Sequence, residues 1–227
     1  MKTVLITGAN GGLGSVVTTA FLDAGAGVAG VAPHIADTDF PHPGFAAFPA
    51  DLSTAAAAAE LVRRVEERLG PVDALVHLVG GFSGGTRVEE TGDDVVERMF
   101  AMNFKTALHA ASAVLPGMRS RGRGRLLAIG ARPAVEPRAL LGAYAASKAA
   151  MVSLWRTLAL ENKDCGITAN VILPGTIDTP ANRKAMPEAN PSGWITPAQI
   201  ASLLVHLASD NGAAVSGALI PMYGAEV

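Results

Sequence analysis

Short apolar segments alternate with longer segments of helical spacing along the whole chain, and this order leaves few folds open to it. The apolar segments have the composition of buried strands: Thr3 to Thr7, Val28 to Ala32, Phe45 to Ala50, Val72 to Val79, Arg125 to Ile129, Ile167 to Leu173 and Ala218 to Pro221. Helical spacing is found over Leu13 to Ala24, Thr54 to Leu69, Asp93 to Arg119, Gly142 to Lys163 and Pro197 to Ser209. The alternation predicts an α/β fold, a doubly wound seven-stranded parallel sheet with helices on both faces.

Length and charge narrow the class of protein further. The chain has 227 residues, of which 49% are hydrophobic, and this suits one domain over residues 1–227. A net charge of -2 offers no general attraction for nucleic acid or for an anionic membrane. The single cysteine, Cys165, cannot form an internal disulfide, and no segment has the pattern of a signal peptide or membrane span. We therefore expect a cytoplasmic protein without a nucleic-acid or membrane partner.

A glycine-rich turn follows the first expected strand and opens the first expected helix: Thr7-Gly8-Ala9-Asn10-Gly11-Gly12-Leu13-Gly14. Glycines allow a tight turn and a close approach of the backbone to a pyrophosphate, whose charge the helix N-terminus accepts. The position of the turn between strand and helix predicts a dinucleotide site.

Tyr144 and Lys148 are four residues apart in an expected helix, so both side chains lie on one face. An ammonium beside a phenol favours the phenolate, so Lys148 is expected to lower the pKa of Tyr144 toward neutrality. A phenol tuned in this way is suited to general acid–base catalysis.

The spacing of Gly8, Gly12 and Gly14 after Thr7 resembles the short-chain dehydrogenase/reductase family. Further matches are Asp51-Leu52 after the third strand, Asn103 in a helix and the segment Pro174 to Thr179, and together they span nearly the whole chain. The resemblance implies a Rossmann fold, NAD or NADP as cofactor, and a homodimer or homotetramer. It implies Tyr144, Lys148 and Asn103 as catalytic residues, and as cofactor-binding residues Thr7, Gly8, Asn10, Gly11, Gly12, Leu13, Gly14, Asp51, Leu52, Gly80, Lys148, Pro174, Thr176 and Thr179.

The choice between NAD and NADP stays open at this point. In this fold an acid at the end of the second strand bonds the ribose 2′-hydroxyl of NAD. Here that position is Ala32, which cannot accept a hydrogen bond, and no arginine beside it would grip a 2′-phosphate. His34 could do so when protonated, although a lone histidine at a strand end is more often simply exposed.

One departure from the broad family, together with two further similarities, points to one of its branches. The family usually has a serine thirteen residues before the tyrosine, and this chain has Ala131 there. Dihydropteridine reductases are similar in this respect and in the segment Gly80-Gly81-Phe82-Ser83-Gly84-Gly85. Their lid also resembles Leu173 to Ala189. This segment overlaps a long, irregular, proline-rich stretch, Pro174 to Thr196, and we expect a substrate lid at about residues 177–195. The resemblance implies a substrate site at Phe82, Ala131 and Tyr144, with the Phe82 ring either stacking on the substrate or packing internally.

Three functions follow from these residues. The first is an NAD(P)H-dependent reductase that transfers hydride to a conjugated substrate such as a quinonoid dihydropterin. The second is a general carbonyl or 3-oxoacyl reductase, and the third is a dinucleotide-binding regulator with weak catalysis. The histidines lack metal-ligand spacing, so no metal site is proposed, and Ser147 is expected to pack against the sheet.

Overall fold

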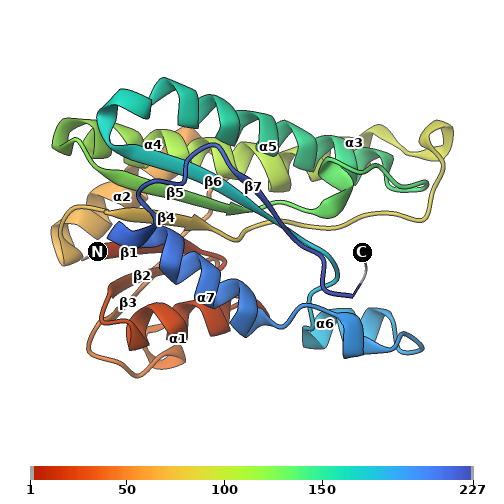
Figure 1. The fold of residues 1–227 in the computed structure, drawn as a ribbon, viewed down its shortest axis with the longest axis horizontal. Helices are drawn as coiled ribbons and strands as arrows, with labels where there is room; N and C mark the ends of the chain where they lie inside the picture. Colours follow the sequence, from red (N-terminus) through yellow and green to blue (C-terminus); the bar gives the residue numbers. More distant parts are fainter. Residues whose placement is uncertain (1–2, 226–227) are drawn as a thin grey trace.

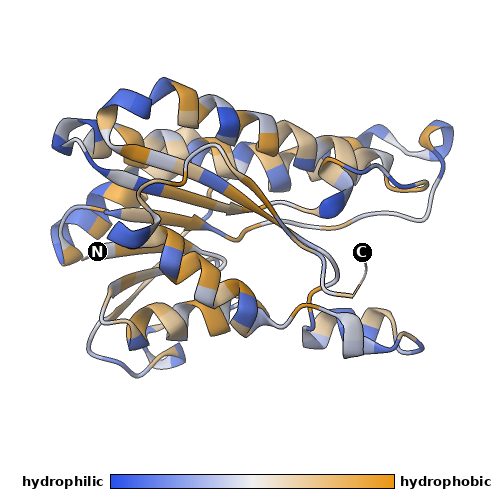
Figure 2. Ribbon diagram, viewed as in Figure 1, coloured by the Kyte–Doolittle hydropathy of each residue, from blue (hydrophilic) through white to orange (hydrophobic). Residues whose placement is uncertain are grey.

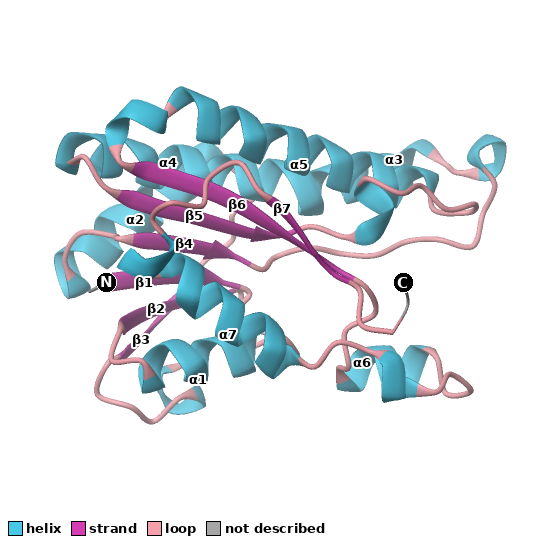
Figure 3. Cartoon of the chain, in the orientation of Figure 1, coloured by secondary structure: helices cyan, strands magenta, loops and turns pink. Residues whose placement is uncertain are grey.

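A computed structural model describes residues 3–225 as one seven-stranded sheet flanked by helices (Figure 1; Figure 3). All strand pairs are parallel, and the strand order is β3-β2-β1-β4-β5-β6-β7. The expected doubly wound α/β architecture is therefore confirmed. The strands are β1 Thr3–Thr7, β2 Gly27–Ala32, β3 Phe45–Pro49, β4 Ala74–His77, β5 Gly124–Ile129, β6 Ile167–Pro174 and β7 Leu219–Met222.

Helices cover both faces of the sheet and divide the core in two. One hydrophobic cluster joins the strands to α2 (Ala55–Leu69), α4 (Thr106–Arg121) and α5 (Gly142–Glu161). The other joins them to α1 (Gly14–Asp23) and α7 (Pro197–Ala208), which lie together on the opposite face (Figure 1). The strands are mostly hydrophobic, whereas hydrophilic residues follow the outer helices and loops (Figure 2). Strands buried on both faces explain the continuous apolar runs of the sequence.

Strand β4 is shorter than the expected Val72 to Val79. It ends at His77, and the amide of Leu78 then donates to the backbone oxygen of Thr7 at 3.2 Å. The Gly8 turn lies directly against the backbone that follows, since a Cβ on Gly8 would be 3.4 Å from the Leu78 carbonyl carbon. The turn therefore occupies the place into which β4 would otherwise extend.

The expected helix Asp93 to Arg119 is interrupted. It consists of α3 (Asp93–Phe100), one π-helical segment (Ala101–Lys105) and α4. Asn103 lies in this widened segment, and its side chain bonds to both backbone groups of Gly81 in the neighbouring loop. Such π segments occur frequently at functional sites.

The stretch Pro174 to Thr196 is not irregular throughout, so that expectation is wrong in part. It contains helix α6 (Pro180–Ala185), whose N-cap Thr179 accepts a hydrogen bond from the amide of Asn182 at 3.2 Å. A capping threonine followed by proline is a helix-start signal that the sequence contains. The two ends of the stretch meet at a bridge between Ile177 and Ile195, and α6 lies beyond the carboxyl ends of the strands (Figure 1).

Within residues 3–225, no helix is both long enough and apolar enough to cross a membrane.

Candidate active site

The glycine-rich turn lies over the carboxyl end of β2. The amide of Gly8 donates to the oxygen of Val31 at 2.7 Å, and Gly8 has a φ of 70°, in the left-handed region that favours glycine. A Cβ on Gly14 would overlap the carbonyl oxygen of Gly8, so α1 could not start this close to the turn with any other residue. The result is a backbone cradle at a helix N-terminus, which fits a dinucleotide pyrophosphate.

The segment 177–195 approaches this cradle at Thr179. A Cβ on Gly12 would be 3.2 Å from the Cβ of Thr179, the residue that caps α6. Thr176 and Pro174 precede it at the end of β6, where the oxygen of Thr176 accepts the amide of Ile195 at 2.9 Å. A ligand held by the glycine turn would therefore be covered by this segment.

Tyr144 and Lys148 both project from α5, as the spacing predicts. The ammonium of Lys148 is buried and donates to the carbonyl oxygen of Ile129, at the end of β5, at 2.9 Å. A Cβ on Gly80 would be 3.0 Å from the Lys148 nitrogen and 2.9 Å from the Asn103 amide oxygen. Because Gly80 has no side chain, the polar groups of Lys148 and Asn103 can both lie close to it, near the carboxyl end of β5.

The expected effect of Lys148 on Tyr144 is not observed. Burial raises the pKa of Tyr144 to about 12, and the Lys148 ammonium is directed at Ile129 instead. Burial also lowers the pKa of Lys148 to about 8, because a charged ammonium is costly away from water. The phenol is consequently protonated at neutral pH, which is the state that a proton donor requires.

Asn103 is buried and connects three elements of the site. Its amide nitrogen donates to the Ser147 hydroxyl at 2.9 Å and to the oxygen of Gly81 at 3.1 Å, and its oxygen accepts the Gly81 amide at 2.8 Å. Ser147 in turn donates to the backbone oxygen of Tyr144 at 2.8 Å. This network ties the π segment, the glycine loop and α5 together.

Phe82 and Ala131, the other two expected substrate residues, offer different surfaces. The Phe82 ring stands edge-to-face against the Tyr144 ring with centroids 5.0 Å apart, and its residue remains 68% exposed. Ala131, two residues after β5, is buried and has no side-chain hydrogen-bonding group. An aromatic face is therefore available beside the phenol, whereas a second hydroxyl donor from position 131 is not.

Three further residues expected at the cofactor site have their polar groups bound internally. The Thr7 hydroxyl lies 3.0 Å from the Nδ1 atom of His77 and accepts the Leu78 amide at 3.2 Å. The Asp51 carboxylate accepts from the backbone and hydroxyl of Ser53, both at 2.9 Å. Asn10 reaches across to the loop after β2, where its amide nitrogen donates to the oxygen of His34 at 2.6 Å.

The remaining cofactor-site candidates contribute backbone or apolar surface. The Gly11 amide donates to the Gly8 oxygen at 3.1 Å, Leu13 is the N-cap position of α1, and Leu52 is buried, with its oxygen accepting from His109 at 2.9 Å.

Two residues that contribute to the site were missed at the sequence level. Ser147 was expected only to pack, but it bridges Asn103 and Tyr144. Its signal is the spacing, because a residue three positions after Tyr144 lies on the same face of a helix. His77 bonds to Thr7, and its signal is a polar residue at the end of an otherwise apolar strand.

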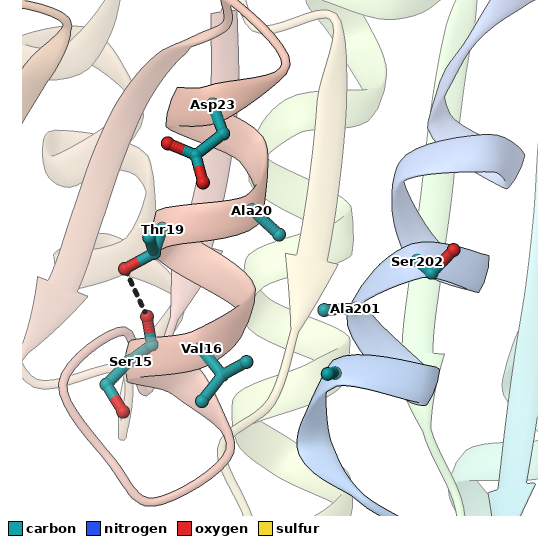
Figure 4. A pocket seen from close by; sticks show the side chains of 8 residues that line it. Ser15, Val16, Thr19, Ala20, Asp23, Ala201 and Ser202 are labelled. Atoms are coloured by element: carbon teal, nitrogen blue, oxygen red, sulfur yellow. Dashed lines mark hydrogen bonds between the residues drawn. The ribbon is translucent and has the colours of Figure 1, made fainter.

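A separate open groove lies between α1 and α7 and is lined by small side chains such as Val16, Ala20 and Ala201 (Figure 4). The hydroxyl of Thr19 in its wall donates to the backbone oxygen of Ser15 at 3.0 Å (Figure 4). None of the residues expected at the site lines this groove. Within residues 3–225, no group of three or more histidine, cysteine, aspartate or glutamate side chains could hold a metal ion.

Comparisons with known proteins agree with this geometry. The family model described as short chain dehydrogenase matches residues 2–190. D-beta-hydroxybutyrate dehydrogenase of Rhizobium meliloti (strain 1021) is 27% identical, over 98% of this chain and 97% of the relative. The 3-oxoacyl-(acyl-carrier-protein) reductase MabA of Mycobacterium tuberculosis (strain CDC 1551 / Oshkosh) is 29% identical, over 98% of this chain and 92% of the relative.

Among solved structures, ElxO with NADP bound superposes with a TM-score of 0.92 at 21% identity, over 98% of this chain and 97% of that one. This likeness concerns the fold. The match to the family model extends over most of the chain and confirms the resemblance drawn from the glycine turn and the Tyr144/Lys148 pair. The chain therefore belongs to the short-chain dehydrogenase family of oxidoreductases.

Proposed function

We propose that this protein is an NAD(P)H-dependent reductase that transfers hydride to a flat, conjugated acceptor, of which a quinonoid dihydropterin is the specific candidate. One observation carries the proposal. A protonated Tyr144 has the exposed Phe82 ring beside it and, at position 131, an alanine in place of a second hydroxyl donor. Such a site offers one acid and an aromatic surface.

Each residue has a defined task in this proposal. A bound dihydronicotinamide supplies the hydride, and the glycine turn with Thr179 holds the cofactor that carries it. Tyr144 gives its phenolic proton to the reduced substrate. Lys148 holds the nicotinamide ribose. Asn103 holds Gly81 directly, positions Tyr144 through Ser147, and supports the return of a proton to the phenol.

The absence of a hydroxyl at Ala131 favours a conjugated acceptor over a simple ketone. Removing one donor to a developing oxyanion typically costs about a hundredfold or more in rate. A quinonoid ring is already electrophilic and spreads the incoming charge over its conjugated system, so it depends less on such a donor. Phe82 could then contact the flat face of the ring, since most of its surface is open to solvent.

A general carbonyl or 3-oxoacyl reductase is the second candidate function. It is favoured by the similarity to the 3-oxoacyl-(acyl-carrier-protein) reductase of Mycobacterium tuberculosis (strain CDC 1551 / Oshkosh), which extends over 98% of this chain. In that case a group from the segment 177–195 must replace the missing hydroxyl at position 131.

The experiment follows the oxidation of NADH and NADPH with quinonoid dihydropterin and with a panel of ketones and 3-oxoacyl thioesters. Tyr144→Phe is the test variant, and Tyr223→Phe is its matched control, since these are the two tyrosines of the chain. We expect dihydropterin turnover that Tyr144→Phe abolishes and the control retains. Equal or faster turnover of ketones would support the second candidate, and tight cofactor binding without any turnover would support a regulator instead.

We also propose that the protein assembles as a homodimer or homotetramer in the cytoplasm. Leu160 on α5 is 73% exposed, and an apolar side chain of this size on a long helix is suited to burial against a second copy. Light scattering of the purified protein measures the oligomeric state directly.

A further inference from the structure

The loop after β2 brings a carboxylate to the glycine-rich turn. This loop contains a short 3-10 helix, Asp37–Asp39, and the carboxylate of Asp39 accepts a hydrogen bond from the side-chain amide of Asn10 at 3.2 Å. The same amide donates to the backbone oxygen of His34 at 2.6 Å, and the Ala36 amide lies 3.4 Å from the Asp39 carboxylate. Asn10 thus fixes Asp39 from the cofactor side of the loop.

The position of the Asp39 carboxylate relative to β2 indicates what it could bind. In dinucleotide-binding folds, the adenosine ribose lies at the end of the second strand, and an acid there bonds its 2′-hydroxyl. Strand β2 ends at Ala32, which is buried and whose side chain has no hydrogen-bond acceptor. The glycine-rich turn lies next to this strand end, since the Gly8 amide donates to the oxygen of Val31. Asn10 belongs to that turn, so a group bonded to Asn10 lies beside the ribose position.

The two acids of the 3-10 helix are not equivalent. The Asp37 carboxylate points away toward β3 and α2, where it accepts the Ala47 amide at 2.7 Å and pairs with Arg68 at 3.1 Å. These bonds to Ala47 and Arg68 lower the pKa of Asp37. Asp39 has no lysine or arginine ion pair among the described residues. Its negative charge is therefore uncompensated where it faces the turn.

We propose that Asp39, held by Asn10, accepts the adenosine ribose 2′-hydroxyl and selects NAD(H) over NADP(H). This inference rests on the proposed function, because it requires a nicotinamide dinucleotide in the glycine turn. A 2′-phosphate in this place would meet a like charge, and Gly11 in the turn has no side chain to neutralise it. The acid that the sequence lacks at position 32 is thus supplied from seven residues further along the chain.

Binding rather than turnover tests this inference. Titration calorimetry measures Kd for NADH and NADPH, and separately for 5′-AMP and adenosine 2′,5′-bisphosphate, with the wild-type chain, Asp39→Asn and Asp37→Asn. Asp37→Asn is the matched control, since it removes the same charge from the same helical turn. We expect wild type to bind NADH at least about tenfold more tightly than NADPH, a ratio that Asp39→Asn reduces to about threefold or less and Asp37→Asn preserves.

The outcomes separate this inference from the proposed function. Equal affinities in wild type, a preference for NADPH, or an unchanged ratio in Asp39→Asn would overturn the role of Asp39. Retained circular dichroism spectra and melting temperatures in both variants exclude misfolding as the reason for a changed ratio. Tight NADH binding with the expected ratio but without hydride transfer would overturn the proposed function and leave the role of Asp39 standing. Failure to bind either dinucleotide would overturn both.

Discussion

The ammonium of Lys148 on α5 donates a hydrogen bond to the carbonyl oxygen of Ile129, the last residue of β5, at 2.9 Å. This bond fixes the lysine at the carboxyl end of β5. The lysine is buried there, and burial lowers its pKa to about 8. Lys148 therefore begins to lose its charge just above neutral pH. The Tyr144 phenol stays protonated to a much higher pH, because burial raises its pKa to about 12.

Reductase activity is predicted to decline as pH rises through about 8. Below the Lys148 pKa the ammonium is charged and binds the ribose of the proposed cofactor through charge-assisted hydrogen bonds; above that pKa the charge is lost and these bonds weaken. The pH profile of kcat/KM between pH 6 and 10 measures the effect. Lys148→Arg is the matched control, since its charge persists over this range and the decline near pH 8 should disappear. A profile that is identical in wild type and Lys148→Arg would contradict the assignment.

Ala131→Ser is predicted to broaden the substrate range. The new hydroxyl would supply a donor to the substrate oxygen, so turnover of simple ketones should rise by about tenfold to a hundredfold. Turnover of quinonoid dihydropterin should change by less than about threefold, because that acceptor depends less on the donor. Steady-state kcat values for both substrates provide the comparison. Ala134→Ser, three residues further along, is the control, and an equal gain there would show that position 131 has no special role.

Asn103→Ala is predicted to destabilise the fold by about 2–4 kcal/mol, because it removes the partners of Gly81 and Ser147 in a buried network. Ser147→Ala removes only the Ser147 bond of Asn103 and leaves its bonds to Gly81, so it should cost about 1 kcal/mol. Urea unfolding of both single variants and the double variant measures the two costs and their coupling. Strict additivity would contradict a shared network, since residues in direct contact are expected to couple.

The sequence predicted the strand and helix order, because apolar periodicity determines it, and the four-residue spacing of Tyr144 and Lys148 predicted that both lie on one helix. It did not predict the π segment or the bonds that Asn103, in that segment, makes to Gly81, 22 residues away in the chain. Long-range contacts of this kind leave no local pattern.

Two other features were outside the reach of sequence patterns for different reasons. The direction of the Tyr144 pKa shift depends on burial, which no spacing of residues reveals. The contact between Asp39 and Asn10 joins two loops 29 residues apart, and only the path of the folded chain after β2 brings them together. Helix α6, in contrast, was predictable from the cap Thr179 and the proline that follows it.

His77 lies at the centre of a buried chain of hydrogen bonds. The Thr106 hydroxyl donates to the Met102 oxygen at 2.6 Å, so it can accept from the Nε2 atom of His77, 3.4 Å away. With the proton on Nε2, the Nδ1 atom is an acceptor, so the Thr7 hydroxyl, which also accepts the Leu78 amide, donates to Nδ1. Both contacts suit a neutral imidazole with its proton on Nε2.

Protonation of His77 is therefore predicted to destabilise the fold in acid. Burial, reinforced by the Lys148 charge, lowers the His77 pKa from 6.5 to about 3, so the unfolded chain binds this proton first. The stabilisation is complete above pH 6.5 and is lost by about 1.4 kcal/mol per pH unit as pH falls toward 3. Urea unfolding at pH 7 and pH 5 should show a loss of about 2 kcal/mol that His77→Asn removes. His34→Asn, at an exposed histidine, should retain the wild-type loss, and an unchanged loss in His77→Asn would contradict the assignment.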